Sequence, residues 1–183
     1  VAAQRRMRDF NSQGLANAAW AFATVGHKEE RLFTALAAAA EQRMRSFNSQ
    51  ALANTAWAFA TVGHQEEQLF TSFAAAAERR MREFNSQDLA NTAWACAVAD
   101  SSADALFGAP QFTERCTDFE QVFSPSELCQ LHQWQLWRDE KGTDWPPLPS
   151  SLAQRCHDAF GEGGSRPSQL QSKVVEALRE VAF

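Results

Sequence analysis

The clearest pattern of apolar and polar positions lies between residues 50 and 62. At about 100° per residue, its apolar side chains fall on one face of a helix. This apolar face consists of Leu52, Ala53, Ala56, Phe59 and Ala60, with Trp57 at its border. The neighbouring stripe is polar and consists of Gln50, Asn54 and Thr61. The pattern predicts an amphipathic helix over about residues 50–62.

A second helix is predicted just before it, over about residues 28–45. Glu29 and Glu30 stand at its start, and Arg43 and Arg45 stand at its end. This arrangement of charge suits the helix dipole, which favours acids at the N-terminus and bases at the C-terminus. Apolar side chains recur at helical spacing between these ends.

The break between the two helices also has a local signature. Ser49 is a good N-cap residue for the following helix. Gly63 supplies a residue that can adopt the left-handed conformation and end that helix. Together the two helices are predicted to form one αα-hairpin.

The hairpin pattern occurs three times in the chain. Its tryptophans are Trp20, Trp57 and Trp94, each 37 residues after the one before. The first two full units differ at only eight of 37 positions. A fixed period in this range is typical of stacked repeats, because a single hairpin cannot bury its apolar faces. We therefore expect an all-α fold in which residues 1–107 form a right-handed helical-repeat solenoid of about three αα-hairpins, the first one truncated.

Residues 108–183 are predicted to form a separate C-terminal helical cap region. The periodic pattern stops at Gly108-Ala109-Pro110. Helices are expected over about residues 125–138, 150–160 and 168–181. Capping boxes open the first and the last of them. No stretch of the chain shows the alternation typical of a strand.

Charge is unevenly distributed along the chain. The formal net charge is −5. The first hundred residues hold ten basic and ten acidic side chains, so residues 101–183 carry the whole excess. Neither half is a polycation, which weakens a nucleic-acid interpretation based on charge alone. No stretch is apolar and long enough to span a membrane.

The sequence predicts no catalytic, metal or cofactor site and no small-molecule substrate. It has no glycine-rich phosphate loop, no motif for a nucleophile–His–acid arrangement and none of the kinase signatures. Cys129 with His132, and Cys156 with His157, are the pairs that most resemble zinc ligands. They lack the paired knuckles of structural zinc sites. No Cys-x-x-Cys pair is present, so we expect free thiols in a reducing compartment.

The motif Phe-x-x-Gln-x-Leu-Ala-Asn-x-x-Trp-Ala-x-Ala, residues 47–60 in the second copy, resembles the octatricopeptide repeat. It also resembles the related heptatricopeptide repeat, of period 37, and the leucine-rich region of the FAST-kinase-domain proteins. Residues 128–134, 148–149 and 168–174 resemble the segment that precedes the RAP domain in those families.

This resemblance implies an RNA-binding protein, not an enzyme, that acts in the mitochondrial matrix or chloroplast stroma. Its partners would be single-stranded organellar transcripts and other proteins of a ribonucleoprotein complex. Its roles would be RNA processing, mRNA stability or translation. Because Val1 falls inside a repeat and Phe183 falls where a RAP domain would begin, we expect a fragment whose targeting segment lies outside it.

Polar rows form the first set of candidate RNA-binding residues. The rows consist of Gln13, Gln50 and Gln87, and of Asn17, Asn54 and Asn91. In a stacked array they would align and could bond RNA. The alternative is that they tie the turns between helices. We favour the structural interpretation for the asparagines, because identical residues in three copies cannot encode a varied base sequence.

A second set varies between the copies while its surroundings do not. Gly14 and Ala18 in the first copy correspond to Ala51 and Thr55 in the second and to Asp88 and Thr92 in the third. The two positions are four residues apart and share a helix face. Such a pair could select bases, or it could be an unconstrained surface, and the sequence leaves both interpretations open.

Arginines at the ends of the first helices form the third set. These are Arg43, Arg45, Arg79, Arg80 and Arg82. Stacked, they would form a ladder suited to phosphates, although dipole complementarity accounts for them equally well. Trp20, Trp57 and Trp94 could stack on bases, but we favour a core role for them.

A protein-interaction scaffold without direct RNA contact is the alternative function. Helical repeats commonly bind peptides and partner proteins, and the net charge is negative. If the arginine ladder and the varying pair share one concave surface, RNA binding is favoured, whereas an apolar or acidic surface there favours the scaffold.

Overall fold

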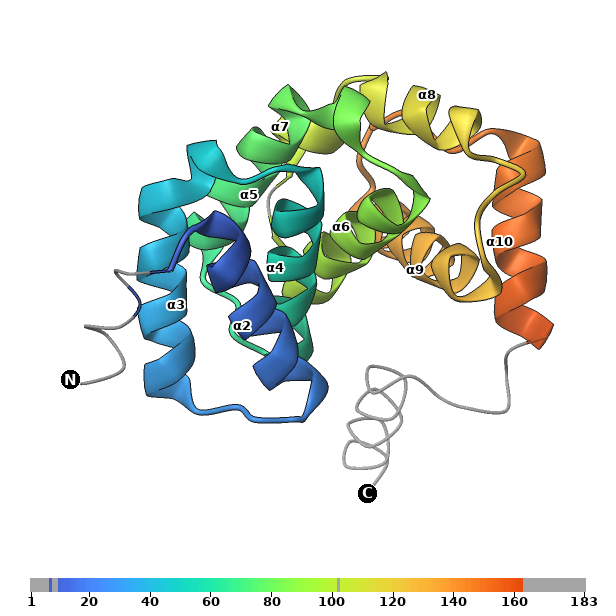
Figure 1. Cartoon of the computed structure of the whole chain (residues 1–183). Coiled ribbons are helices and arrows are strands. Elements are labelled where there is room, and N and C mark those ends of the chain that lie inside the picture. Colours follow the sequence, from blue (N-terminus) through green and yellow to red (C-terminus); the bar gives the residue numbers. More distant parts are fainter. Residues whose placement is uncertain (1–6, 8–9, 102, 163–183) are drawn as a thin grey trace.

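The protein is all-helical in the part of the chain that the structure describes, which is residues 7, 10–101 and 103–162 of a computed structural model. No strand occurs among these residues, as predicted (Figure 1). None of the described helices is long and apolar enough to cross a membrane. The helix predicted over residues 168–181 lies outside the described residues.

Three helices begin at equivalent positions of the three copies. They are α2 (Ser12–Thr24), α4 (Ser49–Val62) and α6 (Ser86–Ala99), and each begins 37 residues after the one before. Gly63 ends α4 with φ of 76°, as predicted. Asp100 ends α6 in the same left-handed region, with φ of 50°.

Asparagine, not serine, caps these helices. The prediction of Ser49 as the N-cap is wrong, because Ser49 is the first helical residue of α4. Asn48 has an extended backbone, and its Oδ1 accepts a hydrogen bond from the Ala51 N–H at 2.8 Å. Asn11 and Asn85 cap α2 and α6 in the same way. A side-chain acceptor at this position satisfies one of the otherwise unpaired N–H groups of the first turn.

The helices between them are α3 (Glu30–Arg43) and α5 (Glu67–Arg79). Each is followed by a short 3₁₀ turn, η1 (Met44–Ser46) or η2 (Met81–Glu83). The 3₁₀ turns replace the last part of the longer helices that the sequence predicts. They tighten the end of each helix before the chain turns into the next one.

The C-terminal part continues the packing of the repeats. It contains α7 (Asp104–Phe107), α8 (Gln111–Asp118), α9 (Pro125–Lys141) and α10 (Ser150–Glu162). Helices α2, α4, α6 and α9 pack side by side in that order, while α3, α5 and α7 form a second row along one side of them (Figure 1). Helix α10 packs on α9. The predicted capping box of α9 is present at Ser124 and Glu127, but α9 extends to Lys141 before Gly142 ends it.

The buried core spans the predicted boundary between residues 107 and 108. One cluster of buried side chains joins α6, α7, α8, α9 and α10. Phe107 lies at its centre, with ring centroids 4.9 Å from Phe112 and 5.2 Å from Trp134. Buried residues from both sides of this boundary therefore share one core.

Candidate functional site

The arginine and glutamine rows lie at one edge of the helical layers. We call this edge, where α3 and α5 end and α2, α4 and α6 begin, the arginine–amide edge. Two contacts between successive repeats hold it together. Ser12 Oγ donates to the Ser46 carbonyl at 3.2 Å, and Arg80 donates to the Arg45 carbonyl at 3.3 Å. The edge consists of Arg43, Arg45, Arg79, Arg80, Arg82, Gln13, Gln50 and Gln87.

The arginines of this edge differ in what they contact. Arg80 is half-buried and pairs with Glu83 at 3.1 Å in addition to its contact with Arg45, so it has a structural role. Arg43 is half-buried. Arg45, Arg79 and Arg82 are exposed. The exposed three are the cations that a ligand can reach.

A hollow of about 460 Å³ opens between the two repeats at this edge. Arg45, Arg79 and Arg80 line it together with Glu83, and Met44 and Ala76 form its apolar part. The guanidinium groups are fixed forks of N–H donors, which match phosphate oxygens. The hollow is therefore suited to an anion, with Glu83 offsetting part of the positive charge.

The amide rows are only partly free. Gln13, Gln50 and Gln87 are exposed near the start of their helices. Asn17 is exposed and Asn54 is half-buried. Asn91 Oδ1 accepts a hydrogen bond from Gln130 Nε2 of α9 at 3.1 Å, which ties α6 to α9. The structural interpretation therefore accounts for Asn91, whereas the glutamines remain available to a ligand.

The varying pairs are interior residues and not a surface. Ala51, Thr55, Asp88 and Thr92 are all buried, between 1% and 6% exposed. Their helices pack on the preceding helix of the layer, α4 on α2 and α6 on α4. Thr55 Oγ1 donates to the Ala51 carbonyl, and Asp88 forms a capping box with Asn85. We therefore remove these four residues from the candidate interface.

Burial raises the pKa of the Asp88 carboxyl, although hydrogen bonds from the Asn85 backbone and the Ser49 side chain oppose the shift. Ionising Asp88 thus costs more in the folded chain than in the unfolded one. This cost is absent below the ordinary carboxyl pKa, grows as pH rises from that value to the raised folded value, and is constant above it. We expect Asp88→Asn to raise the free energy of unfolding at pH about 7 and to lose this advantage at pH about 3. Urea unfolding at both pH values measures it, with Glu41→Gln as a control that removes an exposed carboxylate. A constant difference across this pH range would contradict the account.

The repeated tryptophans are neither fully buried nor free. Trp20 is 46% exposed. Trp57 and Trp94 are half-buried and pack on each other, with ring centroids 6.3 Å apart. Trp94 Nε1 donates to Gln133 Oε1 of α9 at 3.1 Å. The predicted core role therefore holds in part for Trp57 and Trp94, while Trp20 lies at the surface.

The cysteines and histidines of α9 and α10 were the residues that most resembled zinc ligands in the sequence. No group of three His, Cys, Asp or Glu side chains among the described residues could hold an ion. The ring centroids of His132 and His157 are 5.6 Å apart. All four cysteines are free, and burial raises the pKa of Cys96 and Cys156 to about 12. Such thiols stay protonated and are poor nucleophiles.

No protein-family model matches this chain, and no curated protein sequence matches it either. The geometry of the chain's own residues therefore carries the functional argument.

Proposed function

We propose that the chain is a helical-repeat protein that binds single-stranded RNA along the arginine–amide edge. In this proposal the hairpins form a right-handed solenoid with a repeat of 37 residues, of octatricopeptide or heptatricopeptide type. The protein acts on mitochondrial or chloroplast transcripts, in processing, stability or translation, together with other proteins of a ribonucleoprotein complex.

One observation carries the proposal. Arginines and glutamines that recur after 37 residues in the sequence, Arg43 with Arg80, Arg45 with Arg82 and Gln50 with Gln87, lie at the same edge, next to the N-termini of α4 and α6. Exposed Arg45 and Arg82 occupy equivalent places in η1 and η2. A row of cations beside helix N-termini is suited to the phosphates of a strand that runs from repeat to repeat.

The exposed glutamines suit unpaired bases. Gln50 and Gln87 follow the arginines of η1 and η2 by a few residues and lie in the first turn of their helices. A carboxamide can donate to and accept from base edges. Bases of a single strand are open to such contacts, whereas those of an RNA duplex lie in grooves that side chains read poorly. This chemistry favours a single strand over a duplex.

Fluorescence anisotropy with a labelled, unstructured RNA oligonucleotide tests the proposal. We expect binding whose log K falls linearly with log salt between about 0.05 and about 0.2 M, with a slope near −0.7 for each phosphate neutralised. Three exposed arginines predict a slope of about −2. The matched duplex is expected to bind more weakly. Absence of binding at the lowest salt, or affinity that does not change with salt, would contradict the proposal.

A protein-interaction scaffold is the second candidate, and exposed apolar side chains favour it. Phe10 is 42% exposed, whereas its equivalents Phe47 and Phe84 are fully buried. Trp20 and Val25 are also exposed on or next to α2. Exposed apolar side chains on one helix can mark a surface that contacts another protein. Absence of RNA binding, together with binding of a partner protein through α2, would support this function instead.

A further inference from the structure

One side of the helix row α2, α4 and α6 carries a repeated pattern that the arginine–amide edge does not include. In each helix an asparagine and a tryptophan follow the first-turn glutamine by four and seven residues, so the three side chains share one face of the helix. We call the asparagine and tryptophan positions the tryptophan–amide face. It consists of Asn17, Trp20, Asn54, Trp57, Asn91 and Trp94.

This face is uncharged and begins next to the cations of the edge. Helices α2 and α4 contain no charged residue, and the single one in α6, Asp88, is buried. The arginines lie outside these helices, at the ends of α3 and α5 and in η1 and η2. Side chains on a helix lean toward its N-terminus, so those of the tryptophan–amide face lean toward the arginine–amide edge.

A single strand of RNA has the same division of charge. Its phosphates are anionic, whereas its bases are uncharged, aromatic and edged with hydrogen-bonding groups. A strand with its phosphates on the arginines can therefore place its bases on the neighbouring uncharged face.

The third repeat shows which groups the side chains of this face bind. Asn91 Oδ1 accepts a hydrogen bond from Gln130 Nε2, and Trp94 Nε1 donates to Gln133 Oε1, both at 3.1 Å. Both glutamines belong to α9, which packs on α6. A carboxamide presents an N–H donor and a C=O acceptor, as the edges of bases do. The chain's own glutamines thus occupy this face in the third repeat with the chemistry of base edges.

In the first repeat the equivalent positions are open. Trp20 is 46% exposed, and Asn17 is exposed as well. In the second repeat Trp57 is half-buried and packs on Trp94. Trp20 therefore differs from its two equivalents in presenting a large aromatic surface to a ligand. Bases of every kind stack on such surfaces.

We propose that a base of the bound strand stacks on Trp20 while Asn17 bonds the edge of a base, which rests on the proposed binding of phosphates at the arginine–amide edge. Stacking of this kind adds affinity without selecting a base. This agrees with the identity of the asparagine and the tryptophan in all three copies, since identical residues cannot encode a varied base sequence.

A strand without bases distinguishes base contacts from phosphate contacts. The whole chain is titrated, with anisotropy as the signal, against a labelled, unstructured RNA and against a strand of equal length built from abasic nucleotides. We expect the RNA to bind more tightly than the abasic strand by roughly five- to tenfold. The salt dependence should be the same for both strands, because they carry the same phosphates.

Variants at two exposed aromatic residues then locate the stacking. Trp20→Ala should weaken RNA binding by roughly five- to tenfold and leave the affinity for the abasic strand unchanged. Trp20→Phe keeps an aromatic ring and should lose less. Phe10→Ala is the control, because Phe10 is 42% exposed but its ring lies against Gly14, about 120° around the helix axis from Trp20. This variant should bind RNA as the unchanged chain does.

The outcomes are distinct. Tighter binding of RNA than of the abasic strand, lost in Trp20→Ala, supports the stacking. Equal affinities for the two strands, or equal RNA affinities of Trp20→Ala and Phe10→Ala, would overturn it and leave phosphate binding at the edge intact. Trp20 would then belong to the protein contacts of the alternative function. Absence of binding to both strands would overturn the proposed function and the stacking together.

Discussion

Replacing Trp134 with alanine is expected to lower the free energy of unfolding by about 3–5 kcal/mol. Trp134 is fully buried in α9. Its ring centroid lies 5.2 Å from that of Phe107 and 5.1 Å from that of Phe112, which come from α7 and α8. The alanine variant loses both contacts and leaves a cavity between three helices. Urea unfolding followed by circular dichroism measures the loss.

Two controls sharpen this prediction. Trp134→Phe keeps an aromatic ring and removes an indole N–H that has no hydrogen-bond partner. Because an unpaired buried donor is itself unfavourable, this variant should lose less than about half as much stability. Trp20→Ala removes a tryptophan that is 46% exposed and should cost far less than Trp134→Ala. If Trp134→Ala and Trp20→Ala lost similar stability, the assignment of Trp134 to a shared core would be wrong.

Local signals in the sequence were sufficient to predict the end of α4 and the start of α9. Gly63, and the capping box at Ser124 and Glu127, act through the backbone of their own segment. Their effect does not depend on distant residues, so the helix ends that they define could be predicted directly from the sequence. The N-caps were harder, since Asn48 and Ser49 are neighbours and both can cap. Only the backbone conformation, extended at Asn48, distinguishes them.

The sides of each helix that are buried were harder to predict than the place of the helix in the sequence. An amphipathic pattern identifies one apolar side, but α4 is packed against α2, α5 and α6 at once. Ala51 and Thr55 are small and weakly polar, so nothing in the local pattern marks them as buried. Their burial follows from the neighbouring copy, and a pattern within one helix does not contain that information.

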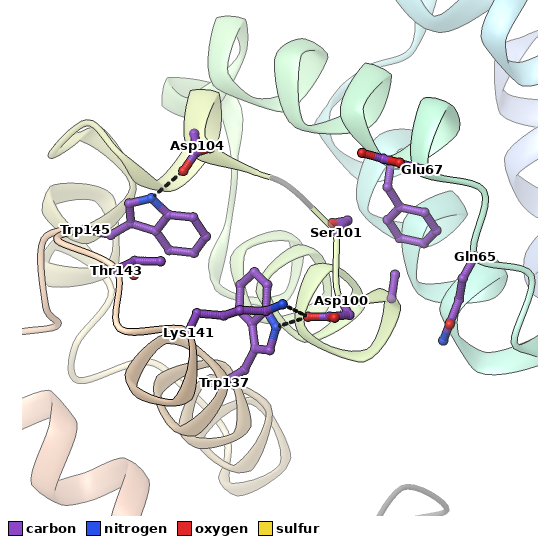
Figure 2. A pocket seen from close by; sticks show the side chains of 11 residues that line it. Gln65, Glu67, Asp100, Ser101, Asp104, Trp137, Lys141, Thr143 and Trp145 are labelled. Atoms are coloured by element: carbon purple, nitrogen blue, oxygen red, sulfur yellow. Dashed lines mark hydrogen bonds and ion pairs between the residues drawn. The ribbon is translucent and has the colours of Figure 1, made fainter.

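Two hollows of the molecule differ in the same way. The one at the arginine–amide edge could be predicted because most residues of that edge recur with the repeat, so that stacking aligns them. The hollow of about 420 Å³ lined by Glu67, Asp100 and Trp145 combines residues from α5, α6, α7 and α9 that are far apart in the sequence (Figure 2). Asp100 takes the place that Gly26 and Gly63 have in the other copies, and this departure from the repeat was the one available signal.

Reversing two arginines of the arginine–amide edge is expected to reduce RNA affinity by about 100-fold at low salt. Arg45 and Arg82 are the suitable pair, because both are exposed and occupy equivalent places in η1 and η2. The double change Arg45→Glu and Arg82→Glu removes two cations and adds two charges that repel phosphate. Arg80 is left in place because its contacts with Glu83 and the Arg45 carbonyl support the fold.

A second charge reversal of equal size at another place distinguishes the effect of where the charge changes from the effect of how much it changes. Lys28→Glu and Arg31→Glu also change the net charge by −4, but these residues lie before and at the start of α3, at the end of that helix away from the edge. This second pair should reduce affinity only slightly, through the overall charge. Circular dichroism should show the same helix content in both variants.

The anisotropy titration of single-stranded RNA with these two variants and the unchanged chain, at about 0.05 M salt, tests the role of the edge most directly. We predict that the Arg45 and Arg82 reversal weakens binding by about two orders of magnitude relative to the Lys28 and Arg31 reversal. Equal affinities of the two charge-reversed chains would show that RNA does not bind at the edge where the repeats align their arginines.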